Sequence, residues 1–190
     1  INSSDTKIIT IEDPIEYHLE GIEQTQVDPD ADYTFVNGLR SMMRQDPDII
    51  LIGEIRDRET SEIAIQASLT GHLVFSTVHA NRASGAIPRL EDLGVKNTSI
   101  GPAMNLIIAQ RLIKKLCVNC KEKTAIANEL KQSLEKFVER LPARVNKSDY
   151  KDFNIYKAVG CDKCSGIGYK GRVAIYELLK IDKEIENVLI

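Results

Sequence analysis

Three short, almost purely apolar runs in the first half of the chain predict three β-strands. They are Lys7–Ile11, Ile49–Ile52 and Leu73–Val78. Continuous rather than alternating hydrophobicity is typical of strands that are buried on both faces, and the connections between the runs are long enough for crossovers. The pattern therefore predicts an α/β fold with a mostly parallel sheet between helices.

Apolar residues at helical spacing predict helices between these strands. One helix is expected over residues 58–69, closed by Gly71 as a C-terminal cap, and another over about residues 34–44. From Ser99 to Leu116 the apolar pattern predicts one long helix.

An amphipathic stretch follows at 127–141, and residues 173–179 are expected to form a closing strand that returns to the sheet or packs on a metal module. Residues 181–190 again have a helix-like pattern, with no stop signal, and the chain starts with Ile rather than Met. We expect the chain to be a piece of a longer protein.

Polar side chains that can carry chemistry follow each predicted strand. Ligands bind outside the carboxyl ends of strands in open parallel sheets, and carboxylates, guanidinium groups and an imidazole together suit a phosphate ester with Mg²⁺. Taken singly, these residues have structural alternatives, since carboxylates at strand ends are usually solvated, the charges from Arg56 to Glu62 can pair along a helix, and His72 can simply begin a strand. The clusters are Glu12, Asp13 and Glu16, then Glu54, Arg56 and Asp57, then His79 and Asn81.

Composition and charge narrow the class of protein. The chain has 190 residues and a net charge of −3, which divides into −9 for residues 1–100 and +6 for residues 101–190. No apolar run approaches the roughly 18–20 residues that span a bilayer, and no signal peptide is recognisable. The sequence predicts a soluble, cytoplasmic protein with no general affinity for nucleic acid.

Four cysteines form two CxxC pairs, Cys117/Cys120 and Cys161/Cys164. Two such pairs supply the four thiolates that structural zinc prefers, although the 40 residues between the pairs exceed the roughly 15–20 of simple zinc ribbons. Unrelated buried thiols and a redox pair are the alternatives.

Four segments resemble, in order, the sequence boxes of the hexameric type II secretion and type IV pilus assembly ATPases. Residues 10–17 (TIEDPIEY) resemble the Asp box, residues 40–57 (RSMMRQDPDIILIGEIRD) the Walker B region, and residues 71–81 (GHLVFSTVHAN) the His box. The cysteine pairs with residues 166–172 (GIGYKGR) resemble the zinc subdomain, which the related pilus-retraction ATPases lack. The resemblance implies a RecA-like P-loop NTPase core with a small tetracysteine zinc-binding subdomain.

The resemblance also implies roles for individual residues. Glu16 would activate or orient the attacking water, Glu54 would hold Mg²⁺ directly or through water, and His79 would sense the γ-phosphate. Arg40, Arg44 and Arg56 would neutralise phosphate charge or act as arginine fingers. Glu12, Asp13 and His72 would bind the cofactor. The zinc ligands would be Cys117, Cys120, Cys161 and Cys164.

By the same resemblance, the cofactors are ATP, Mg²⁺ and Zn²⁺. The partners are five further copies in a homo-hexamer and an inner-membrane platform protein, through which the motor sits peripherally at the cytoplasmic face of the bacterial inner membrane. The implied domains are 1–116 for the partial ATPase core, 117–172 for the zinc subdomain with a helical insertion, and 173–190 for a closing strand and helix.

The phosphate-binding pattern GxxxxGK[ST] occurs nowhere in the 190 residues. In the family this Walker A loop lies shortly upstream of the Asp box, so we expect the chain alone to be inactive as an ATPase. A non-catalytic zinc-binding scaffold is the competing hypothesis, since CxxCxGxG also matches one of the four units of the DnaJ-type zinc domain. A nucleic-acid motor is disfavoured by the acidic first half.

Overall fold

The computed structural model describes residues 1–150 and 152–189, which divide into two compact units. The first unit contains Ile1–Ala109 together with the end of the chain from Tyr176. The second unit contains Gln110–Ile175.

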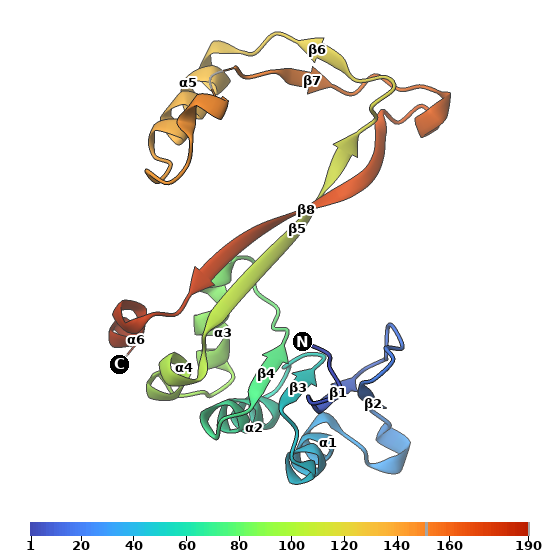
Figure 1. The fold of residues 1–190 in the computed structure, drawn as a ribbon, viewed down its shortest axis with the longest axis vertical. Helices are drawn as coiled ribbons and strands as arrows, with labels where there is room; N and C mark the ends of the chain where they lie inside the picture. Colours follow the sequence, from blue (N-terminus) through green and yellow to red (C-terminus); the bar gives the residue numbers. More distant parts are fainter. Residues whose placement is uncertain (151, 190) are drawn as a thin grey trace. The chain divides into compact units, whose positions relative to one another are not determined.

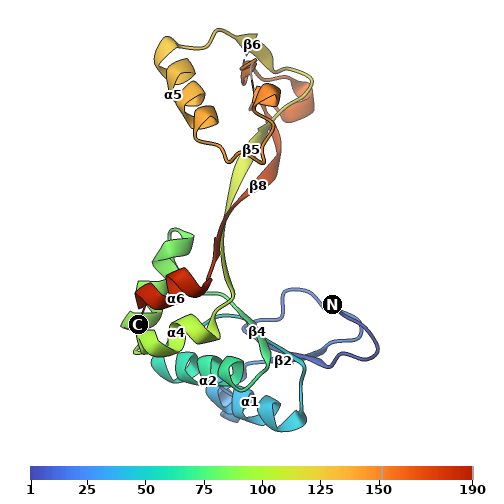
Figure 2. The same ribbon diagram turned by 60° about the vertical axis from the view of Figure 1, so that its left-hand side comes forward.

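Two long strands contain residues of both units. They are β5 (Leu106–Leu116) and β8 (Tyr169–Lys180), which pair in a two-stranded sheet (Figures 1 and 2). The predicted strand at 173–179 is confirmed, and its partner is β5. The domain division at 1–116, 117–172 and 173–190 stays a prediction.

A four-stranded parallel sheet forms the centre of the first unit, with the strand order β2-β1-β3-β4. Its strands are β1 (Ile8–Glu12), β2 (Glu23–Gln26), β3 (Ile49–Ile52) and β4 (Leu73–Ser76). The three apolar strands and the α/β class are therefore confirmed, whereas the polar strand β2 was not predicted.

Helices α1 (Phe35–Met42) and α2 (Arg58–Leu69) pack on one face of this sheet, as Figure 1 shows. Each begins where a side chain accepts a backbone N–H: Thr34 caps α1 and Asp57 caps α2. Gly71, at a φ of +106°, follows α2 as predicted. The core beneath the helices contains Ile9, Ile11, Leu39, Met42, Ile50, Ile52, Ile55, Ala64, Ala67 and Leu93.

The expectation that all three apolar strands are covered on both faces holds for β1 and β3 but is wrong for β4. Ile8, Thr10 and Ile49, which face away from the helices, are also buried. In β4, by contrast, Leu73 and Phe75 are each 43% exposed. Within the described residues β4 is one of the two edge strands of this sheet, and it pairs with a neighbouring strand on one side only.

An apolar groove of about 400 Å³ follows this exposed edge of β4. Its other wall includes Met104, Leu106 and Ile108, which also belong to the first unit.

The single long helix expected from Ser99 to Leu116 is wrong. Helix α4 (Asn97–Ala103) ends just after Gly101–Pro102, and β5 follows at Leu106. The β-branched residues of this segment suit a strand, and β8 supplies the pairing that a local periodicity cannot indicate. Helices α3 (Ala86–Asp92) and α6 (Lys183–Leu189) complete the first unit, and α6 lies within the expected 181–190 run.

Within the residues that the structure describes, the second unit contains a two-stranded antiparallel sheet and one helix, besides its parts of β5 and β8. The strands are β6 (Glu122–Thr124) and β7 (Ile155–Lys157), and α5 (Asn128–Glu139) is the amphipathic helix predicted at 127–141.

Short 3₁₀ turns occur in both units. They occupy Pro29–Ala31, Met43–Gln45 and Ala83–Gly85 in the first unit, and Lys147–Tyr150 and Asp162–Cys164 in the second. Within the part of the chain that is described, no helix has the length and hydrophobicity to cross a membrane.

Candidate functional site

The loops that follow β1, β3 and β4 leave the sheet at the same edge. Their backbones are joined there, since the N–H of Gly53 donates to the carbonyl of Ile11 at 2.8 Å and that of Ile55 donates to Thr77 at 2.9 Å. The hydroxyl of Thr77 also donates to the carbonyl of Gly53 at 2.7 Å. A Cβ on Gly53 would lie 3.3 Å from the Cα of Glu12, so glycine permits this close approach.

Glu54 is the centre of the charged cluster at this edge. One carboxylate oxygen, Oε1, is paired with the guanidinium of Arg56, and the other, Oε2, lies 3.2 Å from Nε2 of His79. Arg56 is also 3.9 Å from the carboxylate of Asp13. The side chain of Glu54 is only 15% exposed, whereas that of His79 is 84% exposed. Three of the predicted loops thus contribute to one cluster.

The hydrogen bond from Arg56 lowers the pKa of the Glu54 carboxyl below its ordinary value, and this effect exceeds the rise caused by burial. The same contact raises the pKa of Arg56. Glu54 is therefore a carboxylate at neutral pH, with oxygen atoms of the kind that Mg²⁺ prefers.

Glu12, at the end of β1, is held by two residues that the sequence did not indicate. The hydroxyl of Thr10 donates to its Oε1 at 2.6 Å, and Nε2 of Gln24 donates to the same oxygen at 3.0 Å. Gln24 lies on β2, which has no apolar pattern, so only the pairing of β2 with β1 brings it to this carboxylate.

Other predicted residues do not join the cluster. Glu16 is exposed in the segment between β1 and β2, and no described contact links its side chain to Glu54 or His79. Arg40 is paired with Glu59 at 2.7 Å, which joins α1 to α2, and Arg44 is exposed in the turn after α1.

His72 lies at the opposite end of β4 from His79. Its Nδ1 is 3.1 Å from the carbonyl of Ala67, near the C-terminal end of α2. The structure therefore separates the two histidines by the full length of the strand. Asp57, from the second polar cluster, caps α2 rather than facing the charged cluster.

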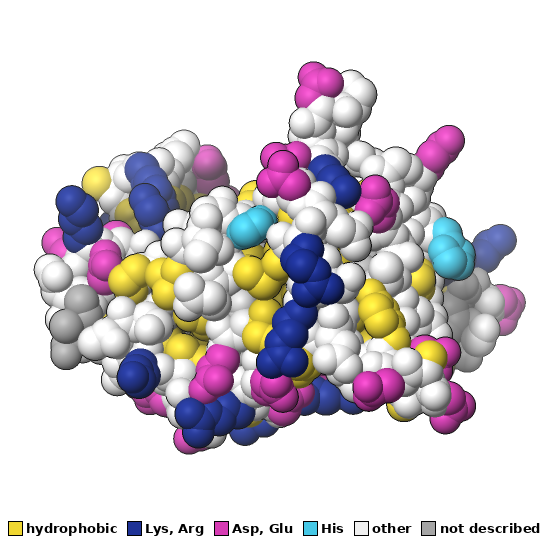
Figure 3. Space-filling view, turned by 90° about the horizontal axis from the view of Figure 1, so that it is seen from below, with side chains coloured by type: hydrophobic (Ala, Val, Ile, Leu, Met, Phe, Trp, Pro, Cys, Tyr) yellow, Lys and Arg dark blue, Asp and Glu magenta, His cyan; other side chains and the backbone are white. Residues whose placement is uncertain are grey.

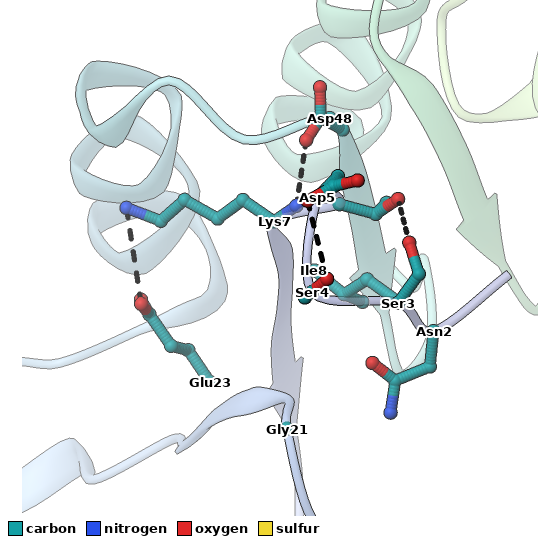
Figure 4. Close-up of a pocket in the computed structure, with 10 residues that line it drawn as sticks. Asn2, Ser3, Ser4, Asp5, Lys7, Ile8, Gly21, Glu23 and Asp48 are labelled. Carbon is teal, nitrogen blue, oxygen red and sulfur yellow. Dashed lines mark hydrogen bonds and ion pairs between the residues drawn. The ribbon is translucent and has the colours of Figure 1, made fainter.

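A polar pocket of about 630 Å³ lies at the amino end of β1, away from the charged cluster (Figure 4). Lys7 reaches across it toward Glu23, at 3.9 Å, while the backbone N–H of Lys7 donates to Asp48 at 2.7 Å. Lys7 and Glu23 thus pair with each other, and Asp48 accepts a backbone hydrogen bond.

On the face shown in Figure 3, basic and acidic side chains lie close together, with hydrophobic areas between them.

The four cysteines form a compact cluster in the second unit, with all Sγ atoms within 4.8 Å of one another. The Sγ–Sγ distances are 4.0 Å for Cys117–Cys161 and 3.8 Å for both Cys120–Cys164 and Cys161–Cys164. Tetrahedral zinc with bonds of about 2.3 Å needs sulfur atoms roughly 3.8 Å apart, so the donor set fits that ion.

Burial and backbone hydrogen bonds act in opposite directions on two thiols of this cluster. Burial raises the pKa of the Cys120 thiol to about 12. Burial is the largest single influence on the pKa of Cys164 and raises it. The N–H groups of Cys161 and Gly168, each 3.2 Å from its Sγ, together with the thiols of Cys120 and Cys161, lower that pKa to about 7 overall. Gly160 has a φ of +114°, and a Cβ on it would lie 2.3 Å from the carbonyl oxygen of Gly166, so both the backbone conformation and the close approach require glycine.

The whole chain is similar to known proteins. The family model described as type II/IV secretion system protein matches residues 1–190. The chain is 47% identical to type II secretion system protein E of Pseudomonas aeruginosa and 45% identical to the type IV pilus assembly ATPase PilB of Thermus thermophilus, and all of it aligns with each. It spans only 36% and 20%, respectively, of those two proteins.

A solved structure agrees with these relatives. The crystal structure of the pilus retraction motor PilT with bound ADP matches 97% of the chain and 41% of its own length, with a TM-score of 0.61 and 30% sequence identity.

Proposed function

Because this chain belongs to the type II/IV secretion system protein family, we propose that it supplies part of the ATP-hydrolysing site of a hexameric motor. The motor would drive assembly of a type IV pilus or a type II secretion pseudopilus. The observation that carries the proposal is the meeting of Glu54, Arg56 and His79 at the carboxyl edge of a parallel sheet, where ligands of such sheets bind. Two of the relatives are named as an ATPase and as a motor with bound ADP.

In this proposal Glu54 holds hydrated Mg²⁺, because its carboxylate is ionised and anchored in the cluster. His79, almost fully exposed beside it, contacts the γ-phosphate of ATP. Arg56 offsets negative charge that develops on the phosphoryl oxygens, and Glu12 and Asp13 contribute carboxylates beside the metal.

Glu16 is proposed as the group that orients the attacking water, on the exposed segment after β1. Arg40 and Arg44 are proposed as charge-neutralising residues on or next to α1, with Arg40 released from Glu59 when it acts. We propose no catalytic role for His72, which lies at the other end of β4.

The phosphate-binding GxxxxGK[ST] loop is proposed to come from a part of the protein outside these 190 residues. We therefore expect the chain by itself not to hydrolyse ATP. The homo-hexamer, the inner-membrane platform partner, and a place at the cytoplasmic face of the bacterial inner membrane belong to the same proposal. Zinc is proposed as the ion held by the four cysteines, where it would stabilise the second unit.

The test is ATP turnover by a protein of the relatives' length that contains this sequence. Glu54→Gln and Glu16→Gln should each lower kcat by about 100-fold or more. Glu20→Gln, an exposed carboxylate in the same segment as Glu16, is the matched control and should leave kcat unchanged. Turnover by the 190-residue chain alone, or full activity of both variants, would contradict the proposal.

The tetracysteine cluster favours a second candidate function, a non-catalytic zinc-binding scaffold. The protein of the relatives' length that is prepared for the ATPase assay also distinguishes the motor from the scaffold. One bound zinc per chain without nucleotide binding or hydrolysis in the longer protein would support the scaffold.

A further inference from the structure

The loop between β4 and α3 carries His79 and Asn81 and ends at Ala83, the first residue of a 3₁₀ turn that continues into α3. The residue before it, Arg82, offers no side-chain cap. Ala83 is 1% exposed, so its backbone N–H needs a hydrogen-bond acceptor inside the protein.

That acceptor is Glu177, which lies 94 residues later in the chain. Oε2 of Glu177, on β8, accepts the N–H of Ala83 at 2.9 Å. A carboxylate at the first N–H of a helical turn is favoured both by charge and by the orientation of the backbone dipoles. Glu177 thus caps, from a distant strand, the turn that closes the loop.

Apolar contacts hold the same loop on the same strand. Val78 and Ala80, which flank His79, pack in a cluster with Leu179 and Ile181. Residues two apart on a strand face the same side, so Glu177 and Leu179 present one face of β8 to the loop. All of these residues belong to the first unit.

The side chain of His79 is 84% exposed and has one described hydrogen bond, to Glu54. Its position therefore depends mainly on where its backbone is held. We infer that Glu177 is a positioning residue for His79: through the N–H of Ala83 it fixes the loop that presents the imidazole to Glu54. The inference rests on the proposed function for its catalytic consequence, whereas the structural link stands without it.

Glu177→Ala and Glu177→Gln separate this role from general stability. The side-chain amide oxygen of Gln can still accept the N–H of Ala83, whereas the methyl side chain of Ala has no acceptor. The matched control is Glu184→Ala, another exposed carboxylate of the first unit. In the 190-residue chain, Glu177→Ala should speed hydrogen exchange of the Ala83 amide by about tenfold or more and shift the His79 ring resonances. Glu177→Gln should restore most of the protection, and Glu184→Ala should change neither signal.

In a protein of the relatives' length, Glu177→Ala should lower kcat about tenfold at an unchanged KM for ATP, and Glu177→Gln should recover most of it. Unchanged exchange of Ala83 in Glu177→Ala would overturn the inference. The inference would also be overturned if Glu177→Gln lost as much Ala83 protection and kcat as Glu177→Ala. Faster exchange of the Ala83 amide with an unchanged kcat would overturn it too. A wild-type protein without ATPase activity would refute the proposed function instead, and the exchange data would still decide the role of Glu177.

Discussion

The contrast between a central and an edge strand of the sheet predicts very different costs for two similar substitutions. Ile50, in β3, is fully buried and pairs in register with Ile9 and Val74. Leu73, in the neighbouring β4, is 43% exposed. Ile50→Ala and Leu73→Ala each remove three carbon atoms, so the difference between them reports burial rather than chemistry.

At about 0.8 kcal/mol for each buried carbon, Ile50→Ala loses about 2.4 kcal/mol of burial, and a cavity in the closed core adds about 1–2 kcal/mol. Leu73 is 43% exposed, so Leu73→Ala loses only the buried fraction of this, about 1.4 kcal/mol, and leaves no closed cavity because the site is open to solvent. Ile50→Ala should therefore be less stable than Leu73→Ala by about 2–3 kcal/mol.

Urea unfolding followed by circular dichroism measures both values, and an unchanged m value shows that the same transition is compared. Equal destabilisation by the two substitutions would refute the reasoning, because it would mean that the outer edge of β4 is covered as completely as β3.

Three further predictions concern the two candidate sites. Metal analysis should find about one zinc per chain, lost in Cys164→Ser; no zinc and four reactive thiols in the unaltered chain would remove the metal proposal. In an NMR titration, Arg56→Ala should raise the pKa of Glu54 toward its ordinary value of 4.5. Because the pKa of Glu54 is lowered in the folded state, the Glu54–Arg56 pair stabilises the protein fully above the ordinary carboxyl pKa. This stabilisation is lost as the pH falls through the lowered pKa. An unaltered titration of Glu54 in Arg56→Ala would exclude Arg56 as the cause of the shift. Gly160→Ala should destabilise the second unit by about 3 kcal/mol or more, since the new Cβ would lie 2.3 Å from the carbonyl oxygen of Gly166 at a φ of +114°; an unchanged Tm would show that the backbone can move aside.

Much of the candidate site was predictable because strand ends can be recognised in the sequence. The apolar runs of β1, β3 and β4 stop where polar residues begin, and parallel strands bring such ends to one edge of a sheet. This predicted that Glu16, Glu54 and His79 meet at one edge of the sheet. Glu54 and His79 do meet there, whereas Glu16 is exposed in the segment after β1, with no described contact to either. The CxxC spacing likewise predicted four thiolates around one point, which the sulfur distances match.

Pairings between distant residues were not predictable. The sequence does not show that Gln24 holds Glu12 or that Glu177 caps the turn at Ala83, because the first contact depends on the pairing of β2 with β1 and the second on the position of β8.

The sequence by itself determined the elements whose signal is local. The continuous apolar runs of β1 and β3, the amphipathic α2 and α5, and the cysteine spacing each carry their information within a few neighbouring residues. Tertiary structure alone decided the rest. β2 is a strand although its residues are EQTQ, because β1 offers it a backbone to pair with, and β5 is a strand rather than a helix because β8 lies beside it. Backbone hydrogen bonds between strands join residues far apart in the chain, so no local pattern of side chains can predict them.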